Sequence, residues 1–434
     1  MEGGATLADR VDLPTSPTSL VLEGEQDIGL EYLAPSVTLL MVPRLSSVLV
    51  SIGREIGLYP LQGDNVLSPT CTHEFQVGDV SCSAALHRFN DDDDEDVGAW
   101  IASGTSAGSI AVYRLDGTSS ELAALRWLND GGKITSSPVT VLAVASSHPS
   151  LLMASHKVGS IFVYDLQLEH EAPMKVVDGS PRSALLSMPA SSSPDLTAPM
   201  PHRKSIREKL LERRDTMLTS RKKPSVTAID TADFRVIQRG KGTIRNPIRC
   251  FQLAASPITD MQFGADDQLL AVGQRSGLIA VIDMSASPPK KVALFESWFG
   301  AITCLAWGTS SDGRRLLASG SQDDLVAVYD VDRGICLAHG VGHRSWPRQV
   351  AFVGPQTVMS VGEDGNMVVW EIGQIRRRSR TDVGAGAAGP MIPMLDPFTV
   401  ARIHAEPCAC LAIHADVVVT LCRLGRLKLW RLQQ

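Results

Sequence analysis

Histidine, serine and aspartate can move protons between one another, and one stretch of the chain holds all three. His343 stands in a Gly-His turn, Ser360 in the next apolar run, Asp364 in a Gly-Glu-Asp-Gly turn, and Trp370 ends the run after it. No HExxH motif and no GxxxxGK[ST] phosphate loop accompanies them. The string GTSAG at 104–108 stands between two apolar runs as a hairpin turn. We therefore expect no enzymatic activity and no catalytic residue, so His343 needs a structural explanation.

The composition of the chain favours many short strands and turns. The 434 residues are 44% hydrophobic and only 5% aromatic, and they include 36 glycines and 25 prolines. That balance suits an all-β protein better than one built from long helices. The net charge of −6 argues against a general affinity for nucleic acid or an anionic membrane, so we expect neither as a partner.

The eight cysteines form no C-x-x-C pair and show no metal-ligand spacing. We interpret them as small buried side chains in a reducing compartment, and we expect no metal or other cofactor. The acidic, polar N-terminus is unlike a signal peptide, and no apolar run approaches the ~18 residues of a membrane helix. The expected location is the cytoplasm, while basic runs such as 376–380 leave nuclear import open.

One pattern recurs along the chain: an apolar strand, a tight polar turn, and an alternating strand that ends in a bulky residue. Copies align at 269–283, 316–330, 357–371 and 417–431, with two more at 100–114 and 151–165 and a weaker one at 47–61. The strong copies end at Ile282, Tyr329, Trp370, Trp430, Tyr113 and Tyr164. A further short apolar run precedes each copy. Period-2 alternation repeated in this way is the signature of propeller blades.

Seven copies predict an all-β fold, a seven-bladed WD40 β-propeller over residues 18–434. The last copy ends near the C-terminus without an outer strand, so a strand near 18–24 is expected to complete it and close the ring. Residues 1–17 are expected to be disordered. We also predict a disordered insertion at 167–244 between blades 3 and 4, and a flexible loop at 373–397 in blade 6, because both are rich in small, polar or charged residues.

Both insertions, and the acidic run at 91–96, fall where the first strand of a blade meets its second or the third meets its fourth. Those connections share one face of the ring. The loops that join the fourth strand of one blade to the first of the next are short and lie on the opposite face, here called the top face. The top face is therefore where we expect a partner to dock.

In WD-repeat proteins, the four residue types around His343 form a buried chain of hydrogen bonds. Asp364 would accept from His343, His343 would meet Ser360, and Ser360 would accept from the indole N–H of Trp370. Such a chain fixes a blade because a buried polar group is costly unless it is paired. His404 stands at the equivalent place in the last blade, and Ser319 with Asp323 repeats part of the pattern. Blades without the aspartate are expected to depend on packing alone.

Large aromatic side chains precede the first strands of two neighbouring blades. Trp298 and Phe299 stand in one loop and Trp346 in the next, at nearly equal positions of the repeat. Aromatic anchors dominate protein–protein hot spots, so these three residues are the predicted partner-binding site. The alternative is that the rings lie flat on the propeller as satellite core.

The stretch WFGAITCLAW…SGSQDDLVAVYD…GHRSWPRQVAF…SVGEDGNMVVWE resembles the CreC/dystrophia myotonica WD-repeat family. The likeness covers roughly 138–166 and 246–432. Two positions depart from the family pattern: Ala301 replaces a glycine and Pro347 a valine.

This resemblance implies a non-catalytic propeller that binds and activates a ubiquitin-specific protease. It implies Phe299 and Trp346 as anchors, and it allows a second WD-repeat protein in the complex. The chain alone is expected to be a monomer. The alternatives are a substrate receptor of a cullin-type ubiquitin ligase or a general WD40 interaction hub. Such receptors usually carry W-D-x-R after a third strand, and YDVDR at 329–333 does not fit that motif.

Overall fold

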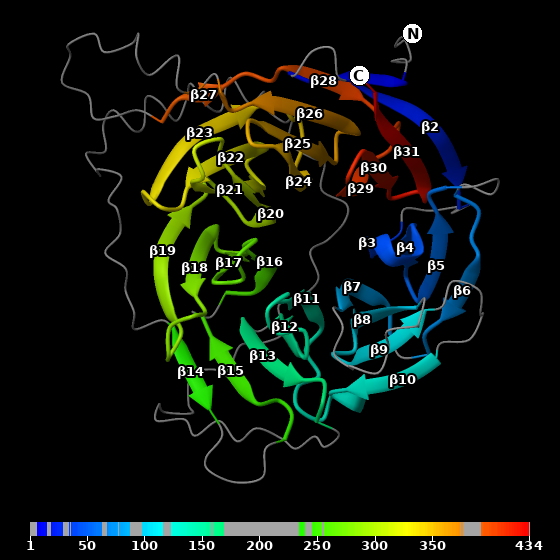
Figure 1. Cartoon of the computed structure of the whole chain (residues 1–434), viewed down its shortest axis with the longest axis vertical. Coiled ribbons are helices and arrows are strands. Elements are labelled where there is room, and N and C mark those ends of the chain that lie inside the picture. Colours follow the sequence, from blue (N-terminus) through cyan, green and yellow to red (C-terminus); the bar gives the residue numbers. More distant parts are fainter. Residues whose placement is uncertain are drawn as a thin grey trace, which may run out of the picture. The chain divides into compact units, whose positions relative to one another are not determined.

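Seven sheets, each built on four antiparallel strands, follow one another around a ring (Figure 1). The protein is described by a computed structural model covering residues 7–14, 19–28, 34, 36–62, 67–76, 78–86, 98–115, 123–157, 159–168, 234–238, 245–253, 256–373, 375 and 392–433. The predicted all-β, seven-bladed propeller is confirmed. The acidic run at 91–96 and the basic run at 376–380 lie outside the described residues.

Blades 1 to 4 follow the chain in order. Blade 1 contains β3 (Val37–Val42), β4 (Ser47–Ile52), β5 (Glu55–Pro60) and β6 (Cys71–Glu74). Blade 2 contains β7 (Val80–Leu86), β8 (Ala99–Thr105), β9 (Ile110–Leu115) and β10 (Ala123–Leu128). Blade 3 contains β11 (Val139–Val144), β12 (Leu151–His156), β13 (Ser160–Asp165), β15 (Arg249–Gln252) and, outermost, β14 (Arg235–Gln238). Blade 4 contains β16 (Ile258–Phe263), β17 (Leu269–Gln274), β18 (Leu278–Asp283) and β19 (Lys290–Glu296).

Blades 5 to 7 complete the ring. Blade 5 contains β20 (Ile302–Thr309), β21 (Arg315–Ser321), β22 (Leu325–Asp330), β23 (Ile335–Val341) and, outermost, β27 (Met394–Leu395). Blade 6 contains β24 (Pro347–Gly354), β25 (Thr357–Gly362), β26 (Asn366–Glu371) and β28 (Thr399–Arg402). Blade 7 contains β29 (Cys408–His414), β30 (Val417–Cys422), β31 (Arg426–Gln433), β2 (Ser19–Asp27) and, outermost, β1 (Arg10–Asp12). Two short 3-10 turns are η1 (Pro43–Leu45) and η2 (Asp130–Gly132).

The core lies mainly between neighbouring blades. One cluster joins blades 5 and 6 through residues such as Ala318, Val328, Val358 and Val368, and similar clusters join other pairs of blades. The bulky residues that close the repeats are all buried at 0–1% exposure: Tyr113, Tyr164, Ile282, Tyr329, Trp370 and Trp430. Fully burying one large apolar side chain contributes about 1.5–3 kcal/mol, so these residues hold the blades against one another.

The ring closes where β2 pairs with β31 (Figure 1). β2 takes the place that the sequence assigned to a closing strand near 18–24. Three ion pairs reinforce the pairing: Glu23–Arg431 at 2.8 Å, Glu25–Lys428 at 3.4 Å and Asp27–Arg426 at 3.8 Å. The N-terminal expectation fails at 10–12, inside the segment 1–17 predicted to be disordered. Those residues form β1, because Val11 and Leu13 are buried in the cluster between blades 6 and 7.

Both insertions fall between the third and fourth strands of a blade, as predicted, but each differs from expectation in one respect. The insertion at 167–244 lies inside blade 3, between β13 and β15, rather than between blades 3 and 4. Its residues 235–238 form β14, because Phe234 stacks on Phe251 with ring centroids 6.0 Å apart. The loop at 373–397 contains β27, which is anchored by Leu395 at 5% exposure in the cluster between blades 5 and 6. The rest of both insertions lies largely outside the described residues.

Candidate functional site

The strand register places the aromatic residues of blades 5 and 6 at different positions of the repeat. Ile302 pairs with Ser321 in blade 5, and Pro347 pairs with Gly362 in blade 6. The residue before each strand accepts a hydrogen bond from the next turn: Ala301 from Gln322 at 2.9 Å, and Trp346 from Glu363 at 3.0 Å. Ala301 is therefore the equivalent of Trp346. Counting back three residues makes Trp298 the equivalent of His343, so the predicted near-equality of the aromatic positions is wrong.

Blade 6 contains most of the expected hydrogen-bonded chain. Nδ1 of His343 lies 3.1 and 3.2 Å from the two carboxylate oxygens of Asp364, and its Nε2 lies 2.6 Å from Oγ of Ser360. Asp364 also accepts the N–H groups of Arg344 at 2.8 Å and Asn366 at 3.1 Å. Burial by itself would raise the pKa of the Asp364 carboxyl, but His343 and the two N–H groups outweigh it and lower that pKa.

The last predicted bond in blade 6 is not formed. Nε1 of Trp370 has no hydrogen-bond partner among the described residues, although its ring centroid lies 5.9 Å from that of His343. The nitrogen instead faces the backbone of blade 5, where a Cβ added to Gly340 would lie 2.8 Å from it. Trp370 therefore supports the blade by packing, while the polar chain ends at Ser360.

Asp364, His343 and Ser360 have the connectivity of a Ser-His-Asp triad, in which the serine attacks a substrate carbonyl. His343 is 1% exposed and Ser360 is 0% exposed. A nucleophile must lie within about 3 Å of the atom it attacks, and no substrate can approach a hydroxyl sealed inside a blade. The arrangement therefore stabilises blade 6 and cannot carry acyl transfer.

Blade 7 has a polar chain of its own, which the sequence did not predict beyond His404. Nε2 of His404 lies 3.0 Å from Oγ1 of Thr420, and Nε1 of Trp430 donates to the same oxygen at 3.0 Å. Leu424 stands where blade 6 has Asp364, and Nδ1 of His404 has no hydrogen-bond partner among the described residues. Burial, aided by the charges of Lys428 and Arg426, lowers the pKa of His404 to about 3.

The prediction that blades without the aspartate depend on packing alone is therefore wrong for blade 7. Blade 2 departs from it as well, because Oγ of Ser103 lies 2.9 Å from the hydroxyl of Tyr113. In both blades a serine or threonine of the second strand lies diagonally across from an aromatic residue of the third, two residues out of register, and this combination was visible in the sequence. That pair was the signal that could have found both chains.

In blade 5 the same parts are arranged differently. Asp323 accepts the backbone N–H of Phe299 at 3.0 Å and that of Leu325 at 3.1 Å, and it also accepts from the hydroxyl of Ser321. Ser319 reaches the hydroxyl of Tyr329 at 3.4 Å. Among the described residues, no hydrogen bond joins Asp323 to the Ser319–Tyr329 pair, because blade 5 has Trp298 where blade 6 has His343. Asp323 consequently fixes a loop rather than a buried histidine.

Phe299 is the most exposed large hydrophobic side chain among the described residues, at 60%. Its loop, residues 297–301, is nevertheless well fixed. Oγ of Ser297 donates to the carbonyl of Gly300 at 2.8 Å, while Asp323 holds the N–H of Phe299. Gly300 has φ +86°, a conformation that favours glycine. A rigid loop that presents an exposed aromatic ring is suited to binding a partner, since little order is lost on docking.

Trp298 and Trp346 are half-buried. Trp298 packs edge-on against His339 of β23, with ring centroids 5.5 Å apart, whereas its neighbour Phe299 is exposed. Trp298 therefore supports the loop from below with one part of its ring and is exposed with the other. The structure brings Trp298 and Phe299 together in one loop and places Trp346 at the base of the top-face loop that follows.

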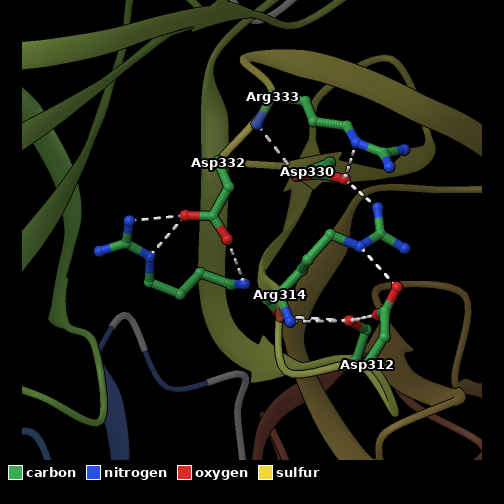
Figure 2. Close-up of polar contacts among 7 residues, drawn as sticks. Asp312, Arg314, Asp330, Asp332 and Arg333 are labelled. Carbon is green, nitrogen blue, oxygen red and sulfur yellow. Dashed lines mark hydrogen bonds and ion pairs between the residues drawn. The ribbon is translucent and has the colours of Figure 1, made fainter.

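At the opposite end of blade 5, charged side chains form a group of ion pairs. Figure 2 shows Arg314 lying between Asp312 and Asp330, with Asp332 and Arg333 beside them. Nε of Arg314 lies 2.9 Å from Asp312, its guanidinium also contacts Asp330, and the N–H of Arg333 donates to Asp330 at 3.1 Å. The Asp330 side chain is 0% exposed, so its charge is compensated within the protein.

In the described part of the chain, no group of three or more His, Cys, Asp or Glu residues is placed to hold a metal ion. The same residues include no helix that is long and apolar enough to cross a membrane.

Comparison with known proteins agrees with the repeat. Residues 290–330, which lie in β19 to β22, match the family model described as WD domain, G-beta repeat. The chain resembles a structure from "Crystal Structure of Mitotic Checkpoint Complex" with a TM-score of 0.57 over 95% of this chain and 92% of that chain. The two sequences are 13% identical, so the likeness shows the fold alone.

Two curated proteins are similar in sequence. The UBP9-binding protein bun62 of Schizosaccharomyces pombe is 23% identical over 353 residues, which are 70% of this chain and 57% of that protein. The WD repeat-containing protein 20 homolog of Caenorhabditis elegans is 31% identical over 122 residues, 28% of this chain and 15% of that protein. The matches therefore span about half the length of the first relative and a small part of the second.

Proposed function

We propose that this protein is a non-catalytic scaffold that binds and activates a ubiquitin-specific protease through its top face. The single observation that carries the proposal is Phe299, an aromatic side chain 60% exposed on a loop that Asp323 and Ser297 hold in place. We propose that Trp298, in the same loop, and Trp346, in the next top-face loop, extend this surface; both are half-buried. The family resemblance around 298–371 and the name of the fission yeast relative, a UBP9-binding protein, point to the class of partner.

Activation in this scheme follows from differential binding. The catalytic cysteine, histidine and acid belong to the protease, and the propeller only favours one of its conformations. It shifts that equilibrium by no more than the difference between its affinities for the active and the idle conformation. The propeller is proposed to be a monomer on its own, with room in the complex for a second WD-repeat protein, and to act in the cytoplasm.

The alternative of a ubiquitin-ligase receptor has less support. The string nearest to its motif is Tyr329 to Arg333, and Asp330 within it is fully buried and paired with Arg314. A carboxylate engaged in this way is not available to a ligase adaptor. No other described feature favours that function over a general interaction hub.

The test compares Phe299→Ala with Trp346→Ala in binding and in ubiquitin cleavage. Truncating an interface anchor typically costs about 2 kcal/mol or more, which weakens binding roughly 30-fold. Phe398→Ala is the matched control, because that ring is 45% exposed beside the outer strand of blade 6 rather than on the top face. We expect a captured ubiquitin-specific protease, stimulated by the wild type, to be lost from the Phe299 variant and kept by the control.

Unchanged capture and stimulation by a correctly folded Phe299→Ala/Trp346→Ala variant would contradict the proposal. The aromatic rings would then be satellite core. A captured cullin adaptor without any protease would favour the ligase alternative instead.

A further inference from the structure

We propose that β27, acting through His339, is a support of the Trp298–Phe299 loop, so that the firmness of the docking loop depends on a strand supplied by the insertion of the neighbouring blade. The identity of the docking partner in this proposal rests on the proposed function. The way in which the loop is held rests on contacts among the described residues. His339 and β27 are positioning elements here, because they act on the docking side chain through Trp298.

β27 belongs to blade 6 by sequence and to blade 5 by pairing. It lies between β26 and β28 along the chain, yet it runs parallel to β23 at the rim of blade 5 (Figure 1). His339 pairs with Met394 and Gly340 with Leu395, and the N–H of His339 donates to the carbonyl of Pro393 at 3.0 Å. Leu395 is buried in the core between blades 5 and 6, which fixes the strand in place.

His339 is the residue on which β27 and the top-face loop converge. Its backbone is bound by Pro393, and its ring, in a residue only 4% exposed, packs against Trp298. Burial lowers the pKa of the imidazole, and the charge of Asp323 offsets part of that effect. His339 is therefore neutral at pH 7, and its contact with Trp298 is an edge-to-face contact between two uncharged rings.

Among the described residues, neither ring has a hydrogen bond to a nitrogen or an oxygen. Nδ1 of His339 and Nε1 of Trp298 are both buried without a partner among the described residues, and Nε2 of His339 has only a weak contact with Sγ of Cys336 at 3.9 Å. The orientation of Trp298 consequently depends on packing, and hence on the backbone position of β23. Buried polar atoms left unpaired are costly, so the ring pair is a place where the structure yields when its support is removed.

The consequence for docking follows from the length of the loop. Phe299 directly follows Trp298, and the loop between β19 and β20 is only five residues long, 297–301. Asp323 holds the loop from the inner side of the blade, while Trp298 on His339 holds it from the outer side. Loss of the outer support removes one of the contacts that hold the loop, beside the bonds of Asp323 and Ser297, and so increases the order that must be restored on binding.

The experiment releases β27 and follows the loop directly. Leu395→Ser removes the buried anchor of β27, and Ile392→Ser is the matched control, since Ile392 is in the same segment and 36% exposed. Hydrogen exchange at residues 297–301 is the readout that does not need a partner. We expect exchange of the Phe299 amide to rise about tenfold or more in Leu395→Ser and to stay unchanged in the control, while urea unfolding remains cooperative.

A second pair of variants keeps the test decisive if Leu395→Ser folds poorly. His339→Phe retains an aromatic ring beneath Trp298, whereas His339→Ala removes it. Faster loop exchange in His339→Ala with rescue in His339→Phe supports the ring contact. Equal exchange in both variants and in wild type overturns the proposal.

Binding then separates this proposal from the proposed function. The probe is the ubiquitin-specific protease captured by wild type, and Phe299→Ala is the reference variant. If Phe299→Ala loses the protease and His339→Ala binds it about tenfold more weakly, both ideas stand. If Phe299→Ala loses it while His339→Ala and Leu395→Ser bind normally, the support is wrong and the function stands. If Phe299→Ala keeps the protease, the function fails, and loop exchange alone decides about the support.

Discussion

Blades 5 and 6 carry an aspartate at the same position of the repeat and use it for different purposes. Asp364 lies in the turn after β25, where it accepts from His343 and closes a buried chain. Asp323 lies in the turn after β21, where it accepts the N–H of Phe299. The backbone N–H of Arg344 bonds to Asp364 just as that of Phe299 bonds to Asp323. In both blades the carboxylate thus fixes the top-face loop, and of these two only blade 6 adds a histidine beneath it.

One position in the second strand accompanies the difference between these two blades. A Cβ on Gly362 would lie 2.6 Å from Nδ1 of His343, so the glycine leaves room for the imidazole. Blade 5 has Ser321 there, and its hydroxyl bonds to Asp323 in place of a histidine. Trp298 then turns outward to His339 and Phe299 faces solvent. In blade 5, the absence of the buried histidine thus accompanies an exposed aromatic loop.

The largest stability effect is expected from Asp364→Ala. The change leaves buried His343 without its acceptor and frees the N–H groups of Arg344 and Asn366, so the free energy of unfolding should fall by about 3 kcal/mol. Urea unfolding followed by circular dichroism measures it. Asp416→Ala, which removes an exposed turn aspartate paired with Arg431, is the control and should leave the midpoint nearly unchanged. Equal losses of unfolding free energy in the two variants would mean that the hydrogen-bonded chain of blade 6 stabilises the protein no more than an exposed ion pair does.

His404 in blade 7 tests what a histidine does without an aspartate behind it. Its folded pKa of about 3 lies below the ordinary value of 6.5. Between these values the unfolded chain binds a proton that the folded chain does not, so stability falls as the pH falls from 6.5 toward 3. The slope from this one group is at most about 1.4 kcal/mol per pH unit. His404→Asn should flatten the pH dependence of unfolding in that window.

The comparison of wild type with His404→Asn is needed because another group acts in the opposite direction. Burial raises the pKa of Asp260 to about 6, so between 3.8 and 6 the folded chain holds a proton more tightly than the unfolded chain. That contribution to stability is lost as the pH rises through 6. Identical pH profiles for wild type and His404→Asn would show that His404 does not titrate as its burial implies.

The sequence predicted the repeated strands of the blades, but it did not predict the pairings between strands that are distant in the chain. Strand alternation and closing residues such as Tyr329 and Trp430 recur in each blade, so the seven-bladed fold and its inter-blade core followed from local patterns. β27 pairs with β23 through only two residues, about 55 positions apart in the sequence, and no local sequence pattern marks that pairing. The same holds for β1 and β14, which are short outer strands added to complete blades.

The site was predicted at the level of loops and not of contacts. The sequence could place Trp298, Phe299 and Trp346 on the top face, because each precedes a first strand. It could not show that Trp298 packs on His339, since that contact depends on how β23 curves at the rim of blade 5. Nor could it show that the indole of Trp370 faces Gly340 across the blade interface rather than Ser360.

The smallest stability effect is expected from Asp323→Ala, and it bears most directly on the contrast between the two blades. The bonds to Phe299, Leu325 and Ser321 are at the half-exposed top face, where water can replace the carboxylate, so the free energy of unfolding should fall by only about 1 kcal/mol. Hydrogen exchange of the Phe299 amide should nevertheless accelerate, because its acceptor is gone. A small stability loss with a loosened loop would show that Asp323 serves the docking surface, whereas a loss as large as that of Asp364→Ala would mean that both aspartates hold up the fold.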